Sequence, residues 1–177
     1  MKAKHIILAV IIFLVVVLQN TLFEHIEIFN TQPNLMLVVI ISCALLYGNV
    51  QGAIIGFILG LCYDITSGRM LGLHALLGLY LGLGVGAVNK RLYRENFIVI
   101  IFFTFISTIA YGLAEYILSI WCERIFAARE IRMDLIFAAK NKILPLAIYN
   151  SIISIPVYAV TMLLKNKFES NKIIRKY

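Results

Sequence analysis

Asp64, Arg69 and His74 stand close together between two apolar runs, and they are the first residues whose types could do chemistry. A carboxylate and an imidazole at this spacing could hold a proton or form part of a metal site. The alternative is structural: Asp64 would accept hydrogen bonds from Thr66, Ser67 or nearby backbone, with Arg69 available for pairing. Asp64 and His74 are too few ligands for a metal shell, so the structural role is favoured.

Glu115 is the one acid well inside an apolar run. A charged residue within a membrane span costs a few kcal/mol on insertion scales, about 3 at the centre of a helix. We therefore expect Glu115 to face protein or water and to share a proton or a hydrogen bond inside the bundle. Tyr111 or Asn150 is the predicted partner.

The rest of the chain offers little catalytic chemistry. The serines in the apolar runs have no neighbouring base, and no GxSxG, HExxH or P-loop spacing occurs. Cys43, Cys62 and Cys122 are odd in number and have no CxxC spacing, which indicates neither a disulfide framework nor a metal site. We expect a protein that is not an enzyme and that carries no cofactor or metal.

Two series of glycines recur at every fourth position. This spacing keeps them on one stripe of a helix, where another backbone can approach closely. One interpretation is internal helix packing, and the other is a docking face for another membrane protein. The residues are Gly48, Gly52, Gly56 and Gly60 in the first series, and Gly78, Gly82 and Gly86 in the second.

The elements that position these residues are predicted to be membrane helices. The chain has 177 residues, of which 62% are hydrophobic and 14% are charged, with a mean hydropathy of +0.93. A soluble domain of this size cannot hide so much apolar sequence, which also excludes disordered and fibrous classes. We predict one transmembrane domain over residues 1–177. Its helices are expected at about 5–23, 34–47, 50–66, 71–88, 97–121 and 143–164, with the long run from Leu35 to Ile65 divided at Gly48-Asn49.

The basic residues predict how these six spans are oriented. The net charge is +7, and Lys and Arg gather in short clusters beside the apolar runs, where anionic headgroups attract them. The segments assigned to the inside hold more of them, so both termini are expected in the cytoplasm, and nucleic-acid binding is not expected. The segment 122–142 is expected on the outside, where it could form an interfacial helix or cover a partner. The basic tail, 165–177, could serve as a topology signal or bind anionic lipid.

A set of short motifs over about residues 5–165 resembles the rod shape-determining protein MreD family, and the block from Gly48 to Leu76 is its most specific part. The motifs are, in order, Gln19 to Thr21, Pro33 to Leu35, Tyr47 to Phe57, Gly60 to Gly68, Leu71 to Leu76, Pro145, Tyr149 with Asn150, and Pro156 to Tyr158.

The resemblance implies an all-α integral membrane protein of the bacterial cytoplasmic membrane. Its six-helix bundle would be similar to the substrate-binding subunits of energy-coupling-factor vitamin transporters. The implied partners are MreC, the actin-like MreB and sidewall peptidoglycan synthases, and the implied function is a non-catalytic scaffold of cell elongation. The alternative is a substrate-binding subunit of a vitamin transporter. Nothing in the resemblance assigns a special role to Glu115.

Overall fold

The computed structural model describes residues 13–19, 21, 31–67, 70–88, 97–126 and 134–174, and these are almost entirely helical. A short helical segment covers 13–19. It is followed by the helices α2 (Leu35–Tyr47), α3 (Asn49–Ser67), α4 (Leu73–Val88), α5 (Phe97–Phe126), α6 (Leu135–Ala138) and α7 (Leu144–Ile174), with a π-helical turn η3 (Ala139–Ile143) joining the last two. The all-α prediction is confirmed.

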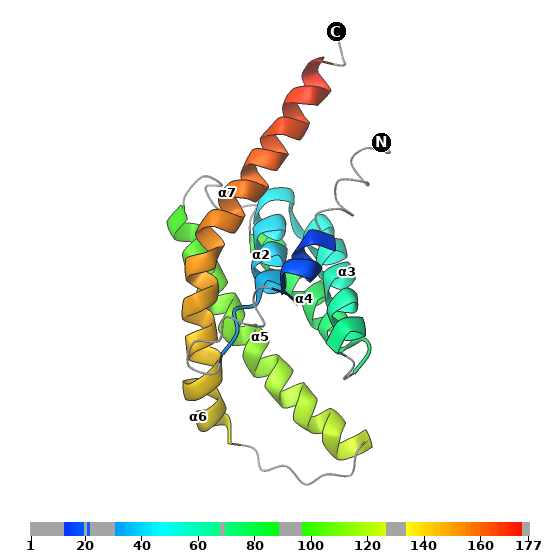
Figure 1. Ribbon diagram of the computed structural model, residues 1–177, viewed down its shortest axis with the longest axis vertical. Helices are drawn as coiled ribbons and strands as arrows, with labels where there is room; N and C mark the ends of the chain where they lie inside the picture. The colour runs from blue at the N-terminus through cyan, green and yellow to red at the C-terminus, as the bar shows by residue number, and fades with distance from the viewer. Residues whose placement is uncertain are drawn as a thin grey trace.

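The helix α2 is the centre of the molecule. Every residue from Leu35 to Leu46 is buried, because α3, α4, α5 and α7 pack around it (Figure 1). At 1.5 Å per residue its length is about 20 Å, well short of a hydrocarbon core of about 30 Å. Its first turn is capped by Asn34, whose Oδ1 accepts a hydrogen bond from Leu37 N at 3.0 Å.

Gly48 separates α2 from α3, at the position where the sequence predicts the long apolar run to divide. Its φ of 94° lies in the left-handed region that glycine adopts without steric cost. The Gly48 N–H still bonds the Ala44 carbonyl at 3.0 Å, which closes the last turn of α2. The chain then turns back, so that α3 runs antiparallel to α2 and α4 runs antiparallel to α3 (Figure 1).

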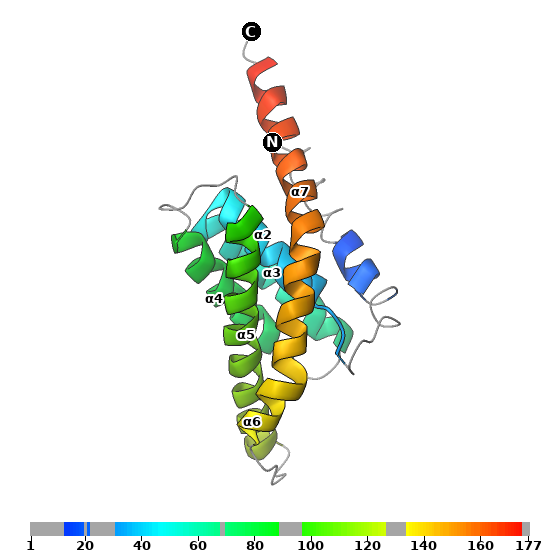
Figure 2. The same ribbon diagram turned by 90° about the vertical axis from the view of Figure 1, so that its left-hand side faces the viewer.

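The helices α5 and α7 are the longest elements, with 30 and 31 residues, and they lie side by side along the α2–α4 group (Figure 2). Both extend past the predicted ends. Hydropathy marks the apolar part of a helix, whereas α5 continues through polar residues to Phe126 and α7 continues past Lys165 to Ile174.

The described residues of the segment 122–142 belong to the ends of the long helical stretches, so an interfacial helix or a partner-covering segment stays a prediction for the rest. Its beginning completes α5, and its end forms α6 and η3, which continue into α7; residues 127–133 lie outside the described part. In η3 the Leu144 N–H bonds the carbonyl of Ala139. The π-helical hydrogen bonding stops there, because Pro145 has no N–H to give to the carbonyl of Lys140.

Three helical stretches are long and apolar enough to cross a membrane, namely Asn49–Ser67, Phe97–Ile125 and Leu135–Lys167. Leu35–Tyr47 and Leu73–Val88 are apolar but shorter. The structure therefore has helices at five of the six predicted positions, two of them too short for a full span, and whether all six cross the membrane stays a prediction. Most of the first predicted span, 5–23, lies outside the described residues.

Candidate functional site

Asp64 is a buried carboxylate, near the end of α3, that anchors the beginning of α4. Its Oδ2 accepts hydrogen bonds from the backbone N–H groups of Gly72 at 2.8 Å and Ala75 at 3.1 Å, and its Oδ1 accepts one from His74 N at 3.2 Å. These N–H groups belong to the start of α4, where a helix leaves donors without intrahelical partners. Asp64 thus caps α4 from a neighbouring helix, which confirms the expected bonding to nearby backbone.

His74 lies between two carboxylates. Its Nδ1 is 2.7 Å from Asp64 Oδ1, and its Nε2 is 3.5 Å from Glu115 Oε1 on α5. The ring also meets the edge of Tyr63, with centroids 4.7 Å apart. The chain Asp64–His74–Glu115 therefore joins α3, α4 and α5 at one end of the bundle through charged or ionisable groups.

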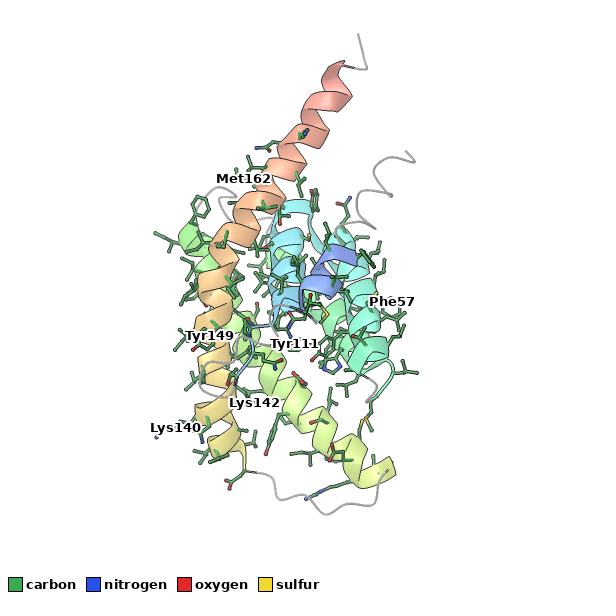
Figure 3. All side chains as sticks on the ribbon, in the orientation of Figure 1. Phe57, Tyr111, Lys140, Lys142, Tyr149 and Met162 are labelled. Carbon is green, nitrogen blue, oxygen red and sulfur yellow. The ribbon has the colours of Figure 1, made fainter. Side chains whose placement is uncertain are left out.

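The predicted partners of Glu115 are wrong, because its ion-pair partner is His74. Asn150 binds elsewhere, and no described group lies within hydrogen-bond distance of the buried Tyr111 hydroxyl. The prediction that Glu115 faces protein is supported by this ion pair, since its side chain is 35% exposed rather than fully open to lipid. Figure 3 shows Tyr111 on the inner side of the bundle, whereas Phe57 points outward from α3.

Of the donors expected for Asp64, only the backbone N–H groups reach its carboxylate, and the two hydroxyls bind elsewhere. The Thr66 hydroxyl bonds the carbonyls of Cys62 and Tyr63, and the Ser67 hydroxyl bonds the Asp64 carbonyl. These hydroxyls satisfy the end of their own helix instead of reaching the carboxylate. Arg69 lies outside the described residues, and within the described ranges no group of three or more His, Cys, Asp and Glu residues is placed to hold a metal ion.

Asn150 joins α7 to the start of α2 at a second buried polar site. Its Oδ1 accepts a hydrogen bond from Asn34 N at 2.8 Å, and its Nδ2 donates to Thr108 Oγ1 at 3.3 Å. The next residue of α2 is bound by a different side chain, because Gln19 Oε1 accepts a hydrogen bond from Leu35 N at 2.8 Å. Because α2 begins inside the protein, these side chains replace the water that its first N–H groups would otherwise bind.

The two glycine series face each other across α3 and α4. A Cβ on Gly56 or Gly78 would clash with the backbone of the other. A Cβ on Gly82 would clash with the backbone of Gly52, whereas a Cβ on Gly52 would first meet Ala44 of α2. The remaining members follow the antiparallel order, with Gly60 against His74 and Ala75, and Gly86 against Asn49. Gly48 is different, because nothing lies near its Cβ position and its role is the positive φ. The internal-packing interpretation thus describes six of the seven glycines.

A shallow apolar groove of about 450 Å³ runs over the outer face of α5 and α7, and we call it the α5–α7 groove. Its polar member, Ser151, is satisfied within its own helix by the Ala147 carbonyl at 2.7 Å. The residues that line the groove therefore present no side-chain polar group that needs a partner from a ligand. It is lined by Ile98, Ile101, Phe102, Phe105, Ile148, Ser151, Ile152 and Ile155.

Several site residues carried no distinctive signal in the sequence. Thr108 and Tyr111 lie in an apolar run that contains other polar side chains. The one signal is that Tyr111 precedes Glu115 by four residues, which places the two on the same face of a helix. Gln19 and Asn34 are polar residues next to apolar runs, which predicts helix ends but not the contacts with Leu35 and Asn150.

The fold and these sites define an all-helical membrane protein whose short central helix is enclosed by longer ones and held by buried polar side chains. The family model of the rod shape-determining protein MreD matches residues 1–168, and the chain belongs to this family. The family is one of shape-determining proteins, which gives the chain a role in rod shape determination. No curated protein and no solved structure matches the chain, so the similarity to vitamin-transporter subunits stays a prediction.

Proposed function

We propose that the protein is a non-catalytic membrane scaffold of the bacterial cell-elongation machinery. It binds MreC and helps couple the MreB filament to sidewall peptidoglycan synthesis in the cytoplasmic membrane. The observation that carries this proposal is the family match over residues 1–168. The internal structure agrees with a scaffold, because the glycines of α3 and α4 and the polar side chains at His74 and Asn150 serve contacts between its own helices.

The α5–α7 groove is the proposed contact for the membrane helix of MreC. It faces outward, at the level of the apolar parts of both helices, and its exposed side chains include Phe102 and Ile152. In lipid, helices associate through close packing rather than through burial of apolar area from water. A groove between two helices offers such packing, whereas the glycine stripes of α3 and α4 already pack against each other and leave no room for a partner.

The cytoplasmic end of α7 is the proposed contact with the inner leaflet. Lys165 and Lys167 follow the apolar part of α7 directly, and Lys172 to Lys176 continue the basic tail. Each basic residue near an anionic surface is worth about 1 kcal/mol, so the tail can hold the protein at the lipid beside a cytoskeletal filament.

Depletion and replacement in a rod-shaped bacterium test the proposal. Loss of the protein should give wide or round cells with mislocalised MreC. An Ile152→Trp variant should fill the groove and reduce co-purification of MreC, whereas Ile54→Trp, on the exposed face of α3, should leave it unchanged; these side chains are 62% and 53% exposed. Depleted cells that stay rod-shaped but need an external vitamin would overturn the scaffold and favour the transporter subunit.

A further inference from the structure

Asp64 fixes the proton on one side of the His74 ring. Both of its oxygens already accept backbone N–H groups, from Gly72, His74 and Ala75. With three N–H donors on its two oxygens this carboxyl group acts as an acceptor, so His74 Nδ1, 2.7 Å away, carries a hydrogen and donates it. The tautomer is thereby set, and the second ring nitrogen, Nε2, is left to face Glu115.

The contact between His74 Nε2 and Glu115 Oε1 then requires a second proton, in addition to the one on Nδ1. At 3.5 Å the two atoms lie closer than a bridging water allows, since a water makes two hydrogen bonds of about 2.8 Å at a wide angle. Without a proton a nitrogen lone pair would face a carboxylate, which is repulsive. With one proton the contact becomes an ion pair or a hydrogen bond, and α5 is held to α4.

The ionisable groups around this proton come from two helices besides α4. From α3 they are Asp64 and Tyr63, and from α5 they are Glu115 and Tyr111. Glu115 is 35% exposed, so its carboxylate provides a route by which the proton can reach solvent. Asp64 is 1% exposed and offers no such route.

Tyr111 supplies a second position for the Glu115 carboxylate. It precedes Glu115 by one turn on the same face of α5, and its residue exposure is 3%. Its hydroxyl has no hydrogen-bond partner among the described residues, which is costly for a buried donor. A rotation of the Glu115 side chain along α5 would satisfy this hydroxyl and would give up the contact with His74.

We propose that His74 and Glu115 form a proton-binding site that latches α5 onto α4, and that release of the proton moves the Glu115 carboxylate to the Tyr111 hydroxyl. In the latched state one proton lies between Nε2 and Oε1. In the released state that proton has gone to solvent, Asp64 still holds Nδ1, and α5 is free of α4 at this end. The pH on the side of the membrane where Asp64 and Glu115 lie therefore controls whether the α3–α4 pair is held to α5. This inference goes beyond the proposed scaffold function and does not depend on it.

The test is a titration of the full-length protein in lipid nanodiscs with a metal chelator present. The ¹⁵N signal of His74 Nε2 reports the proton, with His5 and His25 replaced by Gln to leave one histidine. The single tryptophan, Trp121, lies beyond Glu115 on α5 and reports the position of that helix by its emission. Both signals should change together between about pH 5 and 9.

Two variants should shift the midpoint in opposite directions. Glu115→Gln removes the charge that favours the proton, so the midpoint should fall by about one pH unit, a tenfold loss of proton affinity. Tyr111→Phe removes the partner of the released state, so the midpoint should rise by a similar amount. Glu123→Gln, on the same helix as Trp121, is the control and should leave the midpoint unchanged.

If the titration midpoints of Glu115→Gln and Tyr111→Phe shift in the same direction, or if either midpoint does not shift, the proposal is wrong. A titration that disappears with the chelator and returns with Zn²⁺ would also overturn it and would make the site a metal site. A His74 signal that stays unprotonated throughout would show that no proton lies in the contact.

Discussion

Gly56 and Gly78 face each other across α3 and α4 so closely that a Cβ on either would clash with the backbone of the other. Their hydrogens are the only side-chain volume that the interface can hold. The atoms in the way are a carbonyl group in each case, which cannot move aside as a flexible side chain can. This contact fixes the distance between the two helices whose ends carry Asp64 and His74.

Alanine at Gly56 or Gly78 should therefore destabilise the protein. Overpacking against backbone costs about 1–3 kcal/mol, and Leu at Gly56 should cost more. Gly84→Ala is the matched control on α4, because nothing lies within 4 Å of its Cβ position. That variant should gain up to about 1 kcal/mol from helix propensity. Thermal unfolding in detergent measures both. Equal Tm values for Gly78→Ala and Gly84→Ala would show that the stripe is not packed as described.

Asp64→Ala should release the start of α4. It removes the acceptor of three backbone N–H groups and of His74 Nδ1 at once, and each orphaned buried donor costs about 1–3 kcal/mol. The amides of Gly72 and Ala75 should then exchange with deuterium much faster. Thr66→Ala is the control, because its hydroxyl bonds carbonyls of its own helix and reaches none of these groups. Unchanged protection of Gly72 would contradict the cap.

Asn150→Ala should loosen the start of α2. The variant leaves the part-buried Asn34 N–H and the fully buried Thr108 hydroxyl without their partner, at a cost of about 1–3 kcal/mol. Ser151→Ala is a neighbouring control, because its hydroxyl bonds only a carbonyl of α7 that the helix can satisfy without it. Chemical denaturation compares the two. A Ser151→Ala variant as unstable as Asn150→Ala would indicate a general effect of packing on α7.

The sequence predicted the elements better than the contacts between them, for physical reasons. Fourfold spacing identified the glycine stripes, but only the antiparallel turn after α3 pairs Gly56 with Gly78 and leaves Gly84 open. Tyr111 or Asn150 was predicted as the partner of Glu115. The fold instead brings in His74, from an element 41 residues earlier in the chain, because Asp64 holds the ring in place.

Helix lengths were misjudged for a related reason. Hydropathy reports the part of a helix that lipid or protein surrounds. The helical stretch that contains α7 includes Lys140 and Lys142 in η3 at one end, and α7 itself continues past Lys165 at the other. The same measure made α2 a span, although its apolar surface is covered by neighbouring helices rather than by lipid. Composition alone does not distinguish these two apolar environments.

The orientation of α7 in the membrane is the last prediction. Lys140 in η3 and Lys167 in α7 are exposed and lie at opposite ends of the apolar stretch Leu135–Lys167, about 40 Å apart at 1.5 Å per residue, which exceeds the hydrocarbon core. Figure 3 marks Lys140 and Lys142 near one end of the helix. Because basic residues accumulate inside, Lys167 and the tail should face the cytoplasm and Lys140 the outside.

Cysteines placed at these two positions, in a chain whose three native cysteines are replaced by Ala, measure this orientation. A membrane-impermeant maleimide should label Lys140→Cys in intact cells, and should label Lys167→Cys only after the membrane is opened. The reverse pattern would turn the whole bundle over and place Asp64, His74 and Glu115 at the cytoplasmic face. Because the two positions share one continuous helix, labelling of both in intact cells would show that α7 does not cross the membrane.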